Sequence, residues 1–104
     1  MDKITNTRCV VTGLGMISAI GNNVEECFAN ALAGKTGIDK VASVDTTDCY
    51  ANLGAEVHCD TLDEIDEAKE VDRVSKLCLK ASKEALDDAG LVIDESNAGR
   101  VGVV

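Results

Sequence analysis

The sequence predicts an α/β fold in which strands and helices alternate in the order β-α-β-α-β. Apolar runs without polar alternation, at 8–13 and 100–104, are typical of strands buried on both faces. Two segments, 24–32 and 72–89, repeat their apolar residues with the helical period of about 3.6. A third kind of pattern, strict alternation at 51–57, is typical of a half-exposed strand. The 104 residues correspond to about one domain.

The first predicted helix has a start signal, an apolar face and a stop signal in the right order. Asn22 and Asn23 are good N-caps, and Gly34 suits the position after the C-cap. Its apolar face consists of Val24, Cys27, Phe28, Ala31 and Leu32. We expect Phe28 and Leu32 to face the sheet, so that Phe28→Ala would cost about 3–5 kcal/mol.

The middle of the chain carries weaker signals. Residues 35–49 are predicted to be a loop, with a Thr-Thr-Asp turn signal at 46–48, before the alternating strand at 51–57. Residues 60–70 hold six acids and one lysine, which indicates a solvated acidic connector with room for one helical turn.

The second predicted helix begins at about Asp72 and ends before Gly90. Its buried face is predicted to consist of Val74, Leu77, Cys78, Ala81, Ala85 and Ala89. We expect ion pairs on its solvated face between Lys80 and Glu84 and between Lys83 and Asp87. Two helices cannot cover both faces of three strands, so we expect this chain to be the front piece of a larger α/β protein.

Composition excludes several functional classes. The formal net charge of −9 argues against a nucleic-acid partner, and no apolar run is long enough to span a membrane. An odd count of five cysteines without an export signal predicts reduced thiols in the cytoplasm. With one phenylalanine, one tyrosine and no tryptophan, the core must be aliphatic.

Two glycine motifs resemble nucleotide-binding loops without matching them. Gly13 and Gly15 follow the first predicted strand, but Ser18 occupies the place of the third glycine of a dinucleotide-binding turn. Gly34-Lys35-Thr36 resembles the end of a P-loop, but Ala29 stands where its first glycine is required. We therefore predict no cofactor-binding residue.

The cysteines and the single histidine, His58, form no recognisable catalytic or metal motif. The five cysteines contain no C-x-x-C pair; they are Cys9, Cys27, Cys49, Cys59 and Cys78. His58 and Cys59 are neighbours that Cys49 could join, but structural zinc usually takes closely spaced pairs. Cys9, Cys27 and Cys78 lie in apolar stripes and are expected to be small core residues. The acidic connector lacks the spacing of a calcium loop. We therefore predict no catalytic and no metal-binding residue.

The order of motifs along the whole chain resembles one enzyme family. The motifs are Val10 to Gly15 (VVTGLG), Ser18 with Gly21 and Asn22, Leu32 to Ile38 (LAGKTGI), Val44 to Tyr50 (VDTTDCY), Gly54 to Val57 (GAEV), Val71 to Val74 (VDRV), Ala81 to Leu91 and Arg100 to Val104 (RVGVV). In this order they are similar to the opening of the β-ketoacyl-acyl carrier protein synthases. The similarity covers essentially the whole chain.

The resemblance implies a thiolase fold of two similar α/β halves in five layers, usually as a homodimer. Residues 1–104 would be the N-terminal, truncated part of the first half. The family moves an acyl group from acyl carrier protein to a cysteine and condenses it with malonyl-carrier protein, in fatty acid or polyketide synthesis. The family's cysteine, two histidines and lysine would lie beyond Val104, and neither His58 nor any of the five cysteines matches them. The resemblance implies no metal or other cofactor.

Two other functions are compatible with this sequence. A non-catalytic, chain-length-factor-like paralogue would share this opening and lack the later cysteine. A free-standing small α/β interaction module is the third possibility.

Two departures from the family pattern bear on function. Ser18-Ala19-Ile20-Gly21 lacks the family's usual proline, which removes local rigidity only. Well-known members carry lysines and arginines before the second helix, where they meet the acidic carrier protein. Here Asp66, Glu67 and Glu70 outnumber Lys69, and residues 66–73 have a net charge of −2 from two bases and four acids. We therefore expect this segment to contribute little to carrier-protein docking.

Overall fold

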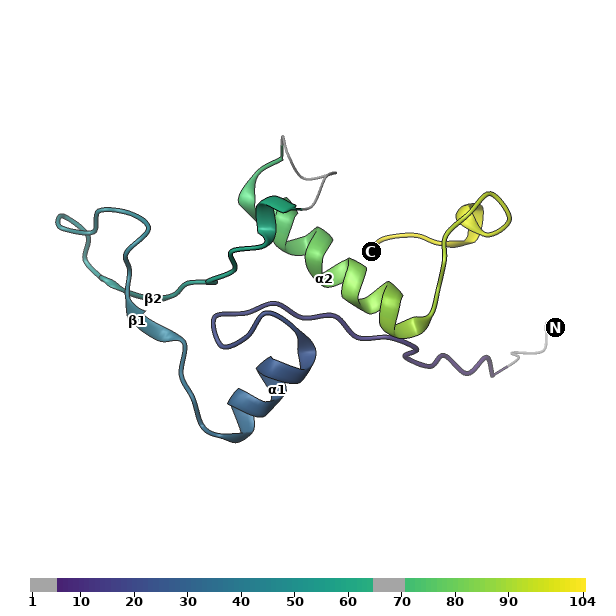
Figure 1. The fold of residues 1–104 in the computed structure, drawn as a ribbon, viewed down its shortest axis with the longest axis horizontal. Coiled ribbons are helices and arrows are strands. Elements are labelled where there is room, and N and C mark those ends of the chain that lie inside the picture. The colour runs from purple at the N-terminus through teal and green to yellow at the C-terminus, as the bar shows by residue number, and fades with distance from the viewer. Residues whose placement is uncertain (1–5, 65–70) are drawn as a thin grey trace.

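The computed structural model describes residues 6–64 and 71–104, which form a small mixed α/β structure. The elements follow in the order α1 (Val24–Leu32), β1 (Ile38–Lys40), β2 (Leu53–Ala55), η1 (Leu62–Glu64), α2 (Arg73–Ala89) and η3 (Ala98–Arg100), where η marks a short 3₁₀ helix (Figure 1). The two predicted helices are confirmed, and the predicted strands are only partly so.

Helix α1 begins and ends where its capping residues predict. Asn23 has an extended backbone, and its side-chain oxygen accepts a hydrogen bond from the N–H of Glu26 at 2.8 Å. Glu25 and Glu26 occupy the first turn, where the helix dipole favours negative charge. Gly34 follows the C-cap with φ of 71°, a left-handed conformation that favours glycine.

Helix α2 is bounded in the same way. The Asp72 side chain accepts a hydrogen bond from the N–H of Ser75 at 3.0 Å, and Gly90 ends the helix with φ of 63°. The predicted ion pair between Lys83 and Asp87 is present at 3.2 Å. The predicted pair between Lys80 and Glu84 is wrong, because both side chains reach across to other segments of the chain.

Strands β1 and β2 form an antiparallel ribbon, in which Ile38 lies opposite Ala55 and Lys40 opposite Leu53. The strand predicted at 51–57 is therefore confirmed in a shorter form, whereas the loop predicted at 35–49 is wrong at 38–40. The N–H groups of Ile38 and Lys40 donate to the side chains of Thr36 and Asp39. These local bonds occupy donors that a further strand would need.

The strands predicted at 8–13 and 100–104 are wrong for this chain. Residues 8–13 lie in no strand, and Val10 and Val11 are 72% and 77% exposed. Residues 98–100 form η3, and Val103 in the following segment is 99% exposed. The physical reason is non-local: an extended segment becomes a stable strand only when neighbours take up its backbone hydrogen bonds.

The apolar face of α1 is also more exposed than the sequence predicts. Within the described residues, the buried hydrophobic side chains are Cys27 and Leu62. Phe28 is 65% exposed and Leu32 74%, because no sheet formed by the described residues lies against α1. The expected cost of 3–5 kcal/mol for Phe28→Ala is therefore wrong for this chain, since truncating an exposed side chain leaves no cavity.

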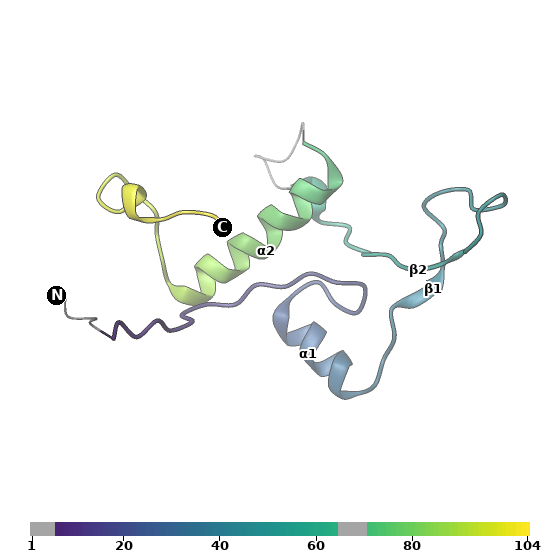
Figure 2. The ribbon, with the colours of Figure 1, turned by 180° about the vertical axis from the view of Figure 1, so that it is seen from behind.

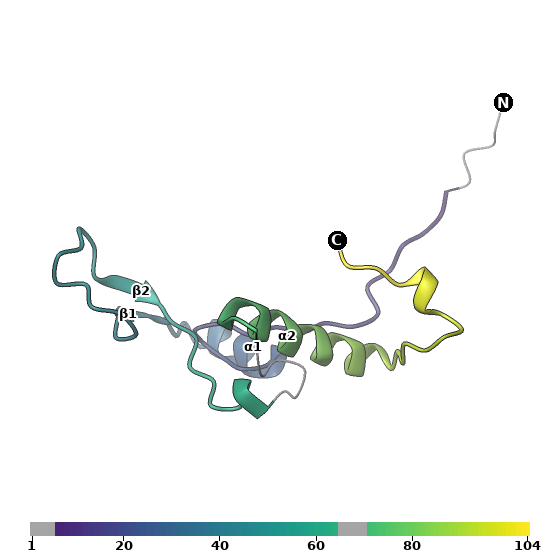
Figure 3. The ribbon, with the colours of Figure 1, turned by 90° about the horizontal axis from the view of Figure 1, so that it is seen from above.

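The fold is elongated, with extents of 62 × 33 × 29 Å. Its radius of gyration is 18.3 Å, against about 13 Å for a compact domain of this size. The ribbon of β1 and β2 projects at one end and the C-terminal segment lies at the other, with α1 and α2 between them (Figures 2 and 3). Neither helix of the described part is long and apolar enough to cross a membrane.

The acidic connector is only partly described. Its first part contains η1, the single helical turn for which the sequence leaves room. Asp66, Glu67, Lys69 and Glu70 lie outside the described residues.

Candidate functional site

The glycine-rich segment lies directly on helix α2. A Cβ added at Gly13 would overlap the carbonyl oxygen of Ala85, and one added at Gly15 would overlap the carbonyl oxygen of Ala81. The small side chains of α2 and the missing side chains of the segment thus allow the two backbones to touch. In this structure the two glycines serve close packing against a helix.

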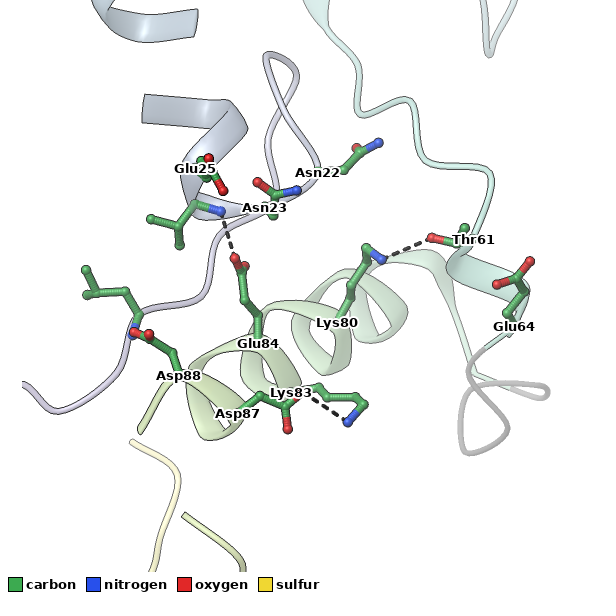
Figure 4. Close-up of a pocket in the computed structure, with 12 residues that line it drawn as sticks. Asn22, Asn23, Glu25, Thr61, Glu64, Lys80, Lys83, Glu84, Asp87 and Asp88 are labelled. Carbon is green, nitrogen blue, oxygen red and sulfur yellow. Dashed lines mark hydrogen bonds and ion pairs between the residues drawn. The ribbon is translucent and has the colours of Figure 1, made fainter. Parts of the chain in front are cut away.

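Two carboxylates of α2 hold this segment by its backbone. Asp88 Oδ2 accepts a hydrogen bond from the N–H of Leu14 at 2.9 Å. Glu84 accepts two: Oε2 from the N–H of Met16 at 2.9 Å, and Oε1 from the N–H of Val24 at 2.8 Å. Figure 4 shows Glu84 reaching from α2 towards the start of α1. Because Val24 is the first residue of α1, Glu84 also satisfies one of the free N–H groups at that helix end.

The four basic side chains of α2 all have partners within the described chain. Lys76 pairs with Asp63, and that hydrogen bond together with the lysine charge lowers the pKa of the Asp63 carboxyl. Arg73 donates to the carbonyl of Val57 at 2.5 Å. Lys80 donates to the Thr61 hydroxyl at 3.0 Å, and Lys83 pairs with Asp87. The bonds of Arg73, Lys76 and Lys80 fasten the segment at 57–63 to the first half of α2.

An open groove runs between the start of α1, the segment around η1 and the outer face of α2 (Figure 4). Acidic, basic and amide side chains line it, including Asn22, Glu25, Glu64, Lys80 and Asp87. Among the described residues, no three His, Cys, Asp or Glu side chains come together in a way that could hold a metal ion. The described lining of the groove therefore contains charged, amide and hydroxyl groups and no cysteine or histidine.

The cysteines differ in burial and in the groups that they contact. Cys27 is buried, with its Sγ 3.1 Å from the Ser18 hydroxyl. Cys9 and Cys78 are exposed, so the expectation that they are core residues is wrong, since residues 6–64 and 71–104 form no sheet that covers them. Cys59 is half-buried beside the Thr61 hydroxyl, at 3.3 Å.

His58 lies in a second, smaller groove, which does not contain a cysteine. Glu56, His58 and Arg73 are among its lining residues, and no cysteine is. His58 thus shares this groove with no cysteine sulfur. A thiolate nucleophile needs such a base or a nearby positive charge.

Glu56 is a structural residue that the sequence reading missed. Its carboxylate accepts hydrogen bonds from the N–H of Ala42 at 2.9 Å and of Ser43 at 3.0 Å. The Ser43 side chain and then these two backbone groups lower the pKa of Glu56 to about 2. The alternating pattern at 51–57 places Glu56 on the outward face of the predicted strand. The pattern does not indicate which backbone groups the carboxylate binds.

We expect the base of the ribbon to loosen in acid. A carboxylate whose pKa is lowered on folding stabilises the fold above its unfolded pKa near 4.5, and that contribution is lost as the pH falls towards 2. Amide exchange at Ala42 and Ser43 would be followed by NMR between pH 6 and pH 2, and the protection factor of both amides, taken relative to the intrinsic rate at each pH, should fall as the pH falls. In Glu56→Gln the same two amides should exchange with no such pH dependence. Equal pH dependence in both proteins would contradict this role.

Comparison with known proteins identifies relatives along almost the whole chain. Residues 6–104 match the family model described as "Beta-ketoacyl synthase, N-terminal domain". The chain is 42% identical over 101 residues to 3-oxoacyl-[acyl-carrier-protein] synthase 2 of Staphylococcus aureus strain COL, covering 94% of this chain and 24% of the relative. It is 37% identical over 107 residues to the protein of the same name from Synechocystis, covering 100% of this chain and 26% of the relative. The chain thus spans about a quarter of the length of the curated relatives it matches.

Proposed function

The chain belongs to the β-ketoacyl synthase family, within its N-terminal domain, and on this premise we propose that it is the first part of a 3-oxoacyl-acyl carrier protein synthase. The observation that carries the proposal is the match over residues 6–104 together with relatives of that name. The proposed reaction has two stages. A cysteine thiolate takes the acyl group from its carrier thioester, and decarboxylation of malonyl-carrier protein then gives an enolate. The enolate carbon attacks the acyl-cysteine, forms the new carbon–carbon bond and releases the cysteine thiolate.

Within this reaction we propose a scaffold role for residues 1–104, with no catalytic, cofactor-binding or metal-binding residue among them. The buried Cys27 touches a serine hydroxyl, and His58 lies in a groove that no cysteine lines. Both observations support the proposal for Cys27 and His58, because a condensing enzyme needs an accessible thiolate with a base or a positive charge beside it. The cysteine and histidines of the reaction would then come from other parts of the protein.

We also propose that residues 1–104 form the N-terminal part of the first half of a thiolase-like fold, in a homodimeric protein. Exposed apolar side chains support this, because a soluble protein rarely leaves so many uncovered. They are spread over both segments predicted as strands and over α1, as Val10, Val11, Phe28, Leu32, Val103 and Val104 show. The five free cysteines support a reducing, cytoplasmic location for that protein.

Acyl carrier protein is the proposed partner, and we propose that residues 66–73, which lead into α2, contribute little to its docking. All four basic side chains of α2 have intramolecular partners, as described above. The preceding residues 66–73 carry a net charge of −2. An acidic carrier would approach a surface of its own sign, which slows association.

A chimera tests the proposed function. Residues 1–104 would replace the aligned quarter of the S. aureus synthase, and condensation of acyl- and malonyl-carrier protein would be followed by product mass spectrometry. We expect condensing activity, because this chain supplies the scaffold and the relative supplies the remainder. Near-UV circular dichroism and the elution volume of the unaltered relative are the folding controls. A chimera that matches the relative in both and forms no product would contradict the proposal.

A further inference from the structure

One carboxylate, that of Glu84, holds two separate points of the chain. Its two oxygens accept the N–H groups of Met16 and Val24, which lie 68 and 60 residues away in sequence. Asp88, one turn further along α2, accepts the N–H of Leu14. We propose that residues 14–24 form a strap that opens from α2 and closes on it as a single unit, latched by Glu84 and Asp88.

The strap is tied together internally, which is the first reason to expect it to move as one body. Ser18 and Gly21 exchange backbone hydrogen bonds in both directions, at 2.9 and 3.3 Å, and so close a tight loop between the two points held by Glu84. The Asn30 side chain donates to the carbonyl of Ile20 at 2.5 Å, which fastens this loop to α1. A Cβ at Gly21 would lie 2.6 Å from the backbone nitrogen of Cys27, so the loop and α1 are in direct contact.

The hydrogen bonds of Glu84 are the second reason to expect the strap to move as one body. The lysines on either side of Glu84 along α2 have other partners: Lys80 donates to Thr61, and Lys83 pairs with Asp87. Glu84 instead accepts hydrogen bonds from two backbone N–H groups of the strap, one of them at the positive end of α1. Because the two oxygens of one rigid carboxylate serve both groups, movement of one group away from Glu84 disturbs the bond to the other.

Beneath the strap there is no space for independent adjustment of its first residues. Gly15 packs against the backbone of α2 at Ala81 and Ala85 so closely that a side chain cannot be fitted. Lifting the strap would therefore separate this contact as well as the hydrogen bonds. The strap has two states, seated or lifted, with little between them.

Amide hydrogen exchange measured by NMR on the 104-residue chain tests the coupling. Asp88→Ala removes the latch at Leu14 and touches neither Met16 nor Val24. If the strap opens as one unit, the exchange rates of Met16 and Val24 should both rise by the same factor, roughly threefold or more. Asp87→Ala, one residue away on the same helix and paired with Lys83 outside the strap, is the matched control and should leave both rates unchanged.

A second variant guards against a local effect of Asp88→Ala on α2. Glu84→Gln keeps one carbonyl oxygen and loses the other acceptor. Independent latches would then leave one of the two amides at its original exchange rate, whereas a single strap requires both to accelerate equally. Unchanged rates at Met16 and Val24 in Asp88→Ala, with Leu14 alone accelerated, would overturn the proposal. Unequal rates of the two amides in Glu84→Gln would overturn it as well.

Discussion

Gly15→Ala is expected to lower the free energy of unfolding of this chain by about 1–3 kcal/mol, the usual cost of overpacking a tight contact. The new Cβ would overlap the carbonyl oxygen of Ala81 and lie 2.8 Å from the backbone nitrogen of Ala85. Both neighbours are backbone atoms of α2, which cannot rotate away as a flexible side chain can. The segment must therefore lift from the helix, and its hydrogen bonds to Glu84 and Asp88 must lengthen.

Urea unfolding followed by circular dichroism measures this effect, and the chain offers matched controls. An added Cβ at Gly99 or at Gly102 would meet nothing within 4 Å, and neither residue has a positive φ. Gly99→Ala and Gly102→Ala should therefore leave the midpoint nearly unchanged or raise it slightly. If Gly15→Ala behaved like these two, the packing of the glycine-rich segment on α2 would be wrong.

Charge reversal before α2 should have the largest effect on the proposed partner. In the chimera, Asp66→Lys with Glu70→Lys changes the charge of residues 66–73 from −2 to +2. We expect the association rate with acyl carrier protein to rise by roughly tenfold at low salt, because opposite charges steer the encounter. The gain should fade as added salt screens the charges. Stopped-flow fluorescence at two ionic strengths measures both effects.

A second double variant separates a local effect on docking from the effect of overall net charge. Asp39→Lys with Asp48→Lys makes the same change in net charge on the projecting ribbon and its connecting loop. This control should raise the rate much less, since it acts only through the overall field. An unchanged or lower rate in Asp66→Lys/Glu70→Lys would show that the acidic residues are no obstacle. Loss of binding in Lys69→Glu alone would place the docking site in this segment after all.

The helices could be predicted from the sequence because their signals are local. Asn23 and Asp72 cap residues only three positions away, and Gly34 and Gly90 adopt a conformation that other residues disfavour. Each signal lies within a few residues of the structure that it forms. Both helices therefore begin and end as predicted.

The strands and the core could not be predicted in the same way, because they depend on distant partners. The apolar run at 8–13 is predicted to be a strand, but it pairs with no strand among the described residues. The same absence leaves Phe28 exposed on α1. Conversely, the short run at 38–40 becomes a strand only because residues 53–55 lie beside it.

The contacts of the candidate site show the same division. Spacing along a helix correctly pairs Lys83 with Asp87, but it wrongly assigns Lys80 to Glu84. Glu84 instead binds backbone groups 60 and 68 residues away, and no spacing rule indicates such partners. The sequence shows only that the glycines at 13 and 15 resemble a nucleotide-binding turn, and their close packing against a helix became visible with the fold. The family assignment came from the order of motifs along the whole chain, which the match to residues 6–104 confirms.

The site of acylation tests most directly whether residues 1–104 are scaffold without a catalytic group. The chimera would be incubated with acyl-carrier protein, digested and mapped by mass spectrometry, with the isolated 104-residue chain treated in parallel. We expect an acyl-thioester on a cysteine that the S. aureus synthase contributes, and no acyl mass on the isolated chain. An acyl group on Cys9, Cys27, Cys49, Cys59 or Cys78, lost when that cysteine is replaced by serine, would contradict the scaffold role.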